Sequence, residues 1–158
     1  MKQLVYIETS IPSFYYEDRE DGVAVTLKKW TQRWWDHYRH VYKLVTSQAV
    51  LDELNHGDYP KKEKCIALLD DLPLLAIESE IAEIVETYIR HKLMPNERGG
   101  DALHLAIASY YKCDILLTWN CSHLANANKF NHIRRVNTLQ GLFVPVLTTP
   151  FELLGEDL

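Results

Sequence analysis

Short apolar runs alternate along this chain with longer segments in which apolar residues recur every three or four positions. The short runs are typical of buried strands and lie at residues 5–7, 41–45, 74–77, 115–117 and 144–147. The longer segments predict helices over residues 21–40, 48–55, 61–72, 79–91 and 101–111. Residues 124–130 also look helical, and residues 133–142 are ambiguous. Strands joined by helices form parallel sheets, so we expect an α/β fold with three layers, α/β/α, and a mostly parallel sheet of about five strands.

Particular residues mark the connections between these segments. Pro12 and the aromatic residues that follow it predict a loop after the first strand. Ser47 and Ser79 stand where N-caps are expected for the helices that follow them.

Length and composition limit the kind of protein this is. With 158 residues and 47% hydrophobic residues, we expect a single domain over residues 1–158. Three cysteines without the spacing of a zinc site favour a reducing compartment. No run approaches the ~20 apolar residues of a membrane span, and no signal-peptide core precedes Glu8, so we expect a soluble, cytoplasmic protein with no membrane partner. A net charge of −5 argues against coating nucleic acid by bulk electrostatics but is compatible with a local basic rim around an acidic site.

Polar residues stand where several of these strands end. Glu8 follows the first strand, Glu53 lies in the short helix after the second, Asp101 begins a helix after two glycines, and Asn120 follows the strand at residues 115–117. The carboxyl ends of parallel strands meet at one edge of the sheet, where such folds bind ligands. Carboxylates gathered there would repel one another without a cation, and oxygen ligands suit Mg²⁺ or Mn²⁺. The helix dipole helps to keep Asp101 ionised. Such a metal activates water and stabilises charge on phosphate, which predicts phosphodiester hydrolysis.

Taken singly, each of these residues also has an ordinary structural role. Asp101 could be a helix cap, Glu53 part of a solvated helix face, and Asn120 a turn residue. Glu8 is the least easily explained in this way, because a glutamate that ends an apolar strand serves neither a cap nor a turn. The prediction of a metal site therefore depends on the whole set.

The set resembles the PIN-domain family, in particular the VapC-type toxins of toxin–antitoxin pairs. The matching segments are YIETSIPSFYY, TSQAVLDEL, GGDALHLAIA and LLTWNCSHL, which together cover nearly the whole chain. The resemblance implies a five-stranded parallel sheet and Mg²⁺- or Mn²⁺-dependent RNA cleavage. It implies that Glu8, Glu53, Asp101 and Asn120 are the catalytic and metal-binding residues. It also implies that Thr9 and Thr118 support the site, and that the protein is a homodimer with an antitoxin partner.

Two positions depart from the family pattern. Glu8 and Asn120 stand where the family usually has aspartate, so the first carboxylate is one methylene longer and the fourth group is neutral. An asparagine oxygen ligates a hard cation less strongly than a carboxylate does. We therefore expect weaker binding of a second metal ion and activity that depends on one ion or on Mn²⁺.

Other residues are candidates for supporting roles. His104 lies one turn after Asp101 and could touch substrate or donate to a site carboxylate, or be a hydrogen-bonded histidine at the edge of the core. Candidate RNA contacts are basic residues whose alternative is an ordinary solvated face: Arg98, Lys129, Arg134 and Arg135. Trp30, Trp34 and Trp35 are most simply core residues. Trp35 lies off the main apolar stripe, and by the resemblance an exposed Trp35 would suit a groove for an antitoxin peptide.

Three functions remain open from the sequence. The first is a metal-dependent ribonuclease that is the toxin of a toxin–antitoxin pair. The second is a PIN-like module that has lost catalysis and binds RNA or protein. Glu8 and Asn120, the two departures from the family pattern, favour keeping this alternative. The third is a metal-dependent phosphatase or DNA nuclease, because it would use the same ligands.

Overall fold

The computed structural model describes residues 1–94 and 100–155 and contains one five-stranded sheet in which every pair of neighbouring strands is parallel. The spatial order is β3-β2-β1-β4-β5, with bounds β1 Leu4–Ile7, β2 Lys43–Ser47, β3 Leu74–Leu75, β4 Ile115–Leu117 and β5 Val146–Thr148. The predicted α/β class and parallel sheet are confirmed. β1 is central, with Val5 paired to Leu44 on one side and Ile115 on the other.

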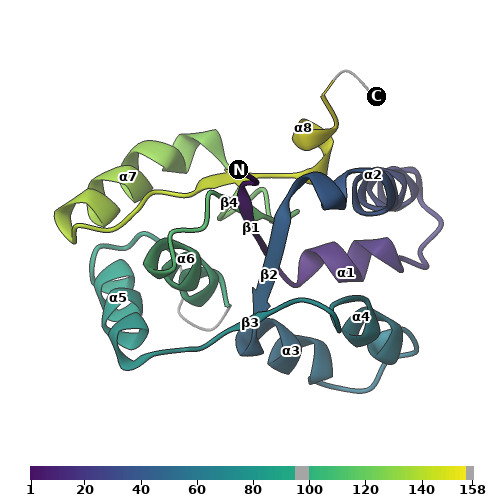
Figure 1. Cartoon of the computed structure of the whole chain (residues 1–158), viewed down its shortest axis with the longest axis horizontal. Coiled ribbons are helices and arrows are strands. Elements are labelled where there is room, and N and C mark those ends of the chain that lie inside the picture. The colour runs from purple at the N-terminus through teal and green to yellow at the C-terminus, as the bar shows by residue number, and fades with distance from the viewer. Residues whose placement is uncertain (95–99, 156–158) are drawn as a thin grey trace.

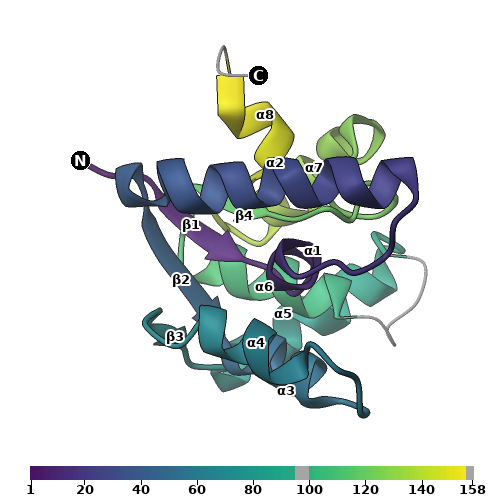
Figure 2. The same cartoon turned by 90° about the vertical axis from the view of Figure 1, so that its right-hand side faces the viewer.

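Helices cover both faces of the sheet, which gives the expected three layers (Figure 1). On one face lie α5 (Ser79–Arg90), α6 (Asp101–Tyr110) and α7 (Phe130–Leu139). On the other lie α1 (Ser10–Tyr15), α2 (Gly22–Tyr38), α4 (Lys62–Leu68) and α8 (Pro150–Leu154). The view in Figure 2 shows α2 running along the outside of this second layer, while α3 (Gln48–Asn55) follows β2 directly. Two short 3₁₀ turns complete these elements, η1 at Arg39–Val41 and η2 at Ala127–Lys129.

The core lies on both sides of β1. Val5, Tyr6 and Ile7 are all fully buried, as are Leu116 and Leu117 of β4. A strand covered by helices on both faces needs apolar residues in succession, which explains why its sequence shows a continuous run and no alternation. Within the described residues, no helix is long and apolar enough to cross a membrane.

Several expected element boundaries were wrong. The segment with Pro12 is helix α1, because proline is tolerated in the first turn of a helix, where its missing N–H is not needed. Residues 124–129 form no α-helix; a turn is followed by η2, and α7 begins only at Phe130 and accounts for most of the ambiguous stretch. The expected strands at residues 41–45, 74–77 and 144–147 and the expected helix at residues 61–72 are each present with shifted or shorter bounds.

The predicted caps also need correction. Ser47 is the N-cap of α3, but its hydroxyl makes no capping bond and instead contacts the Tyr6 hydroxyl. Ser79 is the first residue of α5, and Glu78 occupies the cap position.

Trp34 and Trp35 are buried in the core, with 0% and 4% of their surfaces exposed, which confirms the simpler interpretation of these residues and excludes the alternative of an exposed Trp35 for an antitoxin peptide. The Trp35 ring packs edge-on against Tyr15 and Trp34, and the Arg39 guanidinium lies 4.5 Å from its ring centroid. The buried face of α2 is wider than the regular spacing of its apolar residues indicated, because α1 also packs against this helix.

A buried polar cluster joins the three helices of the first face. The Asn137 side chain of α7 donates to Ser109 Oγ (2.9 Å) and to the Phe143 carbonyl (2.9 Å), and it accepts from the Tyr88 hydroxyl (2.6 Å). Asn137 is fully buried, and its amide N–H groups and its oxygen are all used.

Replacing Asn137 with Ala should lower the free energy of unfolding by about 3 kcal/mol, because it leaves a cavity at a fully buried position and removes the hydrogen bonds to the Tyr88 hydroxyl, to Ser109 and to the Phe143 carbonyl. Urea denaturation measures this change. Asn131→Ala, at an exposed position of the same helix, is the control and should change stability by less than about 0.5 kcal/mol. Equal stabilities of the two variants would contradict the role given to the cluster.

Candidate functional site

Glu8 is fixed at the carboxyl end of β1 by hydroxyl groups from two segments. Its Oε1 accepts from the Thr118 hydroxyl (2.6 Å), from the Ser10 hydroxyl (2.5 Å) and from the Ser10 amide (3.2 Å). Only 6% of Glu8 is exposed. Buried carboxylates are tolerated when hydrogen-bond donors surround them, so these three donors explain how an apolar strand can end in a glutamate.

Ser10 and Thr118 also tie the ends of β1 and β4 together. Ser10 Oγ accepts from the Trp119 amide (2.8 Å), and Thr118 Oγ1 accepts from the Asn120 amide (2.9 Å). Thr118 therefore contacts the site as the resemblance implied, whereas Ser10 was missed. Its signal was a hydroxyl residue two positions after Glu8, where a side chain can turn back to the strand end.

Asn120 presents its nitrogen to the site and its oxygen to its own turn. Oδ1 accepts from the amides of Ser122 (3.2 Å) and His123 (3.0 Å), and Nδ2 donates to Asp101 Oδ1 (3.0 Å). An amide nitrogen is not a ligand for a hard cation. In this arrangement Asn120 holds Asp101 in place, which departs from the expectation that its oxygen ligates the metal.

His104 connects Glu53 to the buried end of β1. Its Nε2 hydrogen-bonds Glu53 Oε1, and its Nδ1 lies 2.7 Å from the Tyr6 hydroxyl, which lies 2.8 Å from Ser47 Oγ. His104 and Tyr6 are fully buried, whereas the Glu53 side chain is 39% exposed. Of the two roles considered for His104, the structure shows both: it contacts a site carboxylate and is a hydrogen-bonded histidine in the core.

The pKa values of the buried side chains of His104 and Tyr6 follow from their surroundings. Burial alone would lower the pKa of His104, but the Glu53 hydrogen bond and the charges of Glu8, Glu53 and Asp101 raise it above the ordinary value. Burial, with the charges of Glu8 and Glu53, raises the pKa of Tyr6 well above its ordinary value in spite of the Ser47 hydrogen bond. Tyr6 therefore keeps its proton. Contacts bring all three carboxylates to one edge of the sheet: Glu53 lies against Gly100, the residue before Asp101, and Asp101 is linked through Asn120 and Thr118 to Glu8.

Because Gly100 has no side chain, α6 can begin in close contact with Glu53 and His104. A Cβ at Gly100 would lie 2.6 Å from Glu53 Oε1 and 2.9 Å from His104 Nε2. The Gly100 carbonyl accepts from the His104 amide (2.8 Å), which fixes the first turn of the helix that carries Asp101. Its backbone angles are ordinary for any residue, so close approach is what requires glycine here.

The donor chemistry fits a hard divalent cation. Glu8, Glu53 and Asp101 each use one carboxylate oxygen in the bonds above, and the other oxygen of each makes no hydrogen bond to a described residue. As the side chains stand, the described part of the chain contains no group of three or more His, Cys, Asp or Glu residues arranged to hold a metal ion. The carboxylates are neighbours that a cation would have to draw closer together.

The remaining predicted residues lie around or away from this cluster. The Thr9 hydroxyl is buried and makes no hydrogen bond to any described residue, so it does not hold Glu8 as Thr118 does. Lys129 donates to the Leu93 carbonyl (2.9 Å), and Arg134 and Arg135 lie further along α7. Arg98 lies outside the described residues. Comparison with protein-family models and with curated proteins found no match to this chain.

Replacing Tyr6 with Phe should lower the free energy of unfolding by about 1–3 kcal/mol, because His104 Nδ1 and Ser47 Oγ each lose a buried partner. Chemical denaturation would detect the change. Tyr110→Phe is the matched control, since that hydroxyl has a single 3.4 Å contact at the surface, and its effect should be near zero. If Tyr6→Phe were as stable as the control, the Ser47–Tyr6–His104 chain would have no structural importance.

Proposed function

We propose that this protein is a divalent-metal-dependent nuclease that hydrolyses RNA phosphodiester bonds. The observation that carries the proposal is the convergence of Glu8, Glu53 and Asp101 at the carboxyl edge of the sheet, each with one oxygen left for a ligand. Parallel α/β sheets bind their substrates at this edge. The choice of RNA, and of a toxin with an antitoxin partner, a homodimeric state and a cytoplasmic location, rests on the resemblance to the PIN-domain family.

The three carboxylates would hold Mg²⁺ or Mn²⁺, and such an ion supplies an activated water and stabilises developing charge on the phosphate. The protein's own groups set the positions of these ligands. Ser10 and Thr118 fix Glu8, His104 fixes Glu53, and Asn120 fixes Asp101. Each ligand is held by a donor from the protein, so the carboxylates are kept as neighbours before an ion binds, and the ion would then draw them closer together.

The second candidate is a PIN-like module that binds RNA or protein without cleaving it. It is favoured by Asn120, whose nitrogen faces Asp101 where the family usually supplies a fourth carboxylate. Three carboxylates provide less charge for a second cation than four would. The two candidates differ in one observable: the nuclease would cleave RNA when a metal ion is present, and the binding module would not.

The test is cleavage of a mixed RNA pool by the full chain in Mg²⁺, in Mn²⁺ and in EDTA, beside Asp101→Asn. The variant keeps the shape of the side chain and can still accept from Asn120 Nδ2, so the fold should be retained while a ligand charge is lost. We expect metal-dependent cleavage that falls by more than about 100-fold in the variant, because loss of a ligand should exceed the 10–100-fold effect of losing its supporting group.

Asp52→Asn is the matched control, because Asp52 lies beside Glu53 in α3 and is exposed, where it pairs with Gln48. It should cleave like the unchanged protein. A folded protein that binds RNA but gives no product in either metal would establish the binding module instead. Equal cleavage of single-stranded DNA would replace the RNA assignment with a broader nuclease, and calorimetry that shows two tight Mg²⁺ sites would contradict the expected weak second site.

Gly100→Ala should reduce metal-dependent cleavage by roughly 10–100-fold, because its Cβ would displace the Glu53 carboxylate from His104. The fold should survive, since the exposed Glu53 side chain can move aside. Gly22→Ala is the control, because a Cβ there would meet nothing within 4 Å. Cleavage by Gly100→Ala at the unchanged rate would show that the Glu53–His104 contact does not matter for the reaction.

A further inference from the structure

The region from β4 to α8 differs in charge from the rest of this acidic chain. Between Asp114 and Glu152 the sequence has no aspartate or glutamate, although the net charge of the chain is −5. The same stretch contains Lys129, Arg134 and Arg135. Its surface therefore attracts acidic partners, whereas the carboxyl edge of the sheet repels them.

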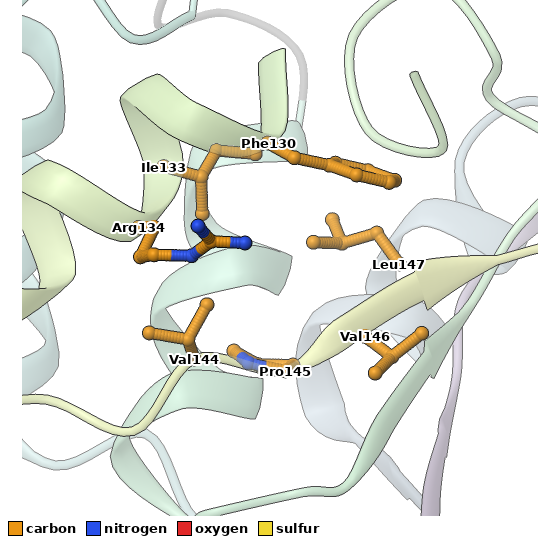
Figure 3. A pocket seen from close by; sticks show the side chains of 7 residues that line it. All are labelled: Phe130, Ile133, Arg134, Val144, Pro145, Val146 and Leu147. Atoms are coloured by element: carbon orange, nitrogen blue, oxygen red, sulfur yellow. The ribbon is translucent and has the colours of Figure 1, made fainter. Parts of the chain in front are cut away.

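A pocket of about 260 Å³ lies in this region, between α7 and the edge strand β5 (Figure 3). Its walls are almost entirely apolar and consist of Phe130, Ile133, Val144, Pro145, Val146 and Leu147, with Arg134 the one charged residue. None of these residues takes part in the carboxylate site described above.

Arg134 is the feature that indicates what the pocket binds. Figure 3 shows its side chain extending over the pocket, with the guanidinium among Ile133, Val144 and Leu147. It makes no hydrogen bond or ion pair with any residue in the described ranges. A guanidinium beside apolar walls is suited to a carboxylate attached to an apolar group, because its planar N–H donors match the two oxygens.

The size and surroundings of the pocket favour a segment of a partner protein over a free small molecule. Its volume is below that of pockets that enclose drug-sized ligands, roughly 300–1,000 Å³, and suits one or two side chains. Apolar surface also continues outside it, since Leu139, at the end of α7, is 72% exposed, and Val146 of the pocket wall is itself 59% exposed. Exposed apolar residues around an arginine are typical of protein interfaces.

The partner segment would be anchored by side chains and would add little to the sheet. β5 has only three residues, and Pro145 beside it has no N–H to donate, so an added strand would gain few backbone hydrogen bonds. RNA is a poorer match, because a run of phosphates needs several cations and Arg134 is the one charged residue among the otherwise apolar residues that line this pocket.

We propose that the pocket between α7 and β5 binds an acidic peptide segment of a partner protein, with an apolar side chain in the pocket and a neighbouring carboxylate on Arg134. This surface is separate from the carboxylate site and does not depend on the proposed nuclease function.

The test is a charge exchange followed by fluorescence anisotropy. The probes are a labelled hexapeptide in which glutamate alternates with leucine and its counterpart with lysine in place of glutamate. The full chain should bind the acidic peptide at least about tenfold more tightly than the basic one, and Arg134→Glu should reverse this preference. Arg135→Glu is the matched control, because it makes the same change of charge at the next residue, outside this pocket, and should keep the preference.

Methyl NMR of Val144 and Leu147 locates the bound peptide. Circular dichroism checks that the variants are folded. Arg134→Gln is a milder second variant, and it should weaken binding of the acidic peptide. Equal effects of Arg134→Glu and Arg135→Glu would overturn the proposal in favour of general charge attraction. Absence of acidic-peptide binding at millimolar concentration would overturn it as well. So would an RNA oligonucleotide that displaces the peptide and binds Arg134→Glu more weakly than Arg135→Glu.

Discussion

The structure of the candidate site depends on keeping three carboxylates close together at one edge of a parallel sheet. Each is held through one oxygen by a donor from a different part of the chain: hydroxyls for Glu8, an imidazole for Glu53 and an amide for Asp101. Donors of this kind satisfy one oxygen of each carboxylate while leaving the second oxygen available. The supporting groups are therefore as much a part of the site as the carboxylates.

The central strand is what brings these supports together. β1 lies between β2 and β4, and its buried Tyr6 reaches both Ser47 at the end of β2 and His104 in α6. Glu8, two residues later, reaches Thr118 after β4. Side chains two apart in a strand point to the same face, so one short strand organises both halves of the cluster. A change in the pairing register of β1 would move both groups at once.

The fold and the set of converging residues could be predicted from the sequence because both follow from the order of elements. Short buried runs that alternate with helices predict a parallel sheet. Parallel strands then place Glu8 and Asn120 at the same edge of the sheet, independently of the directions in which their side chains point. The direction of a side chain could not be predicted in this way. Asn120 points its nitrogen at Asp101 because its oxygen closes a local turn. The need for Gly100 arises from Glu53, 47 positions earlier in the chain, so no local pattern reveals it.

Charge is distributed unevenly over this molecule, and the distribution constrains how the two proposed sites can act. Phosphates approaching Glu8, Glu53 and Asp101 meet negative charge, so the carboxylate edge attracts nucleic acid only when a cation offsets that charge. The acid-free stretch from β4 to α8 attracts anions without a cation, and its Arg134 is an exposed residue beside an apolar pocket. Of the three basic residues in that stretch, Lys129 already donates to the Leu93 carbonyl, whereas Arg134 and Arg135 make no hydrogen bond or ion pair with a described residue. These two cations provide a small attraction for RNA on this side, so binding of a nucleic acid substrate at the proposed nuclease site would still require the metal at the carboxylate edge.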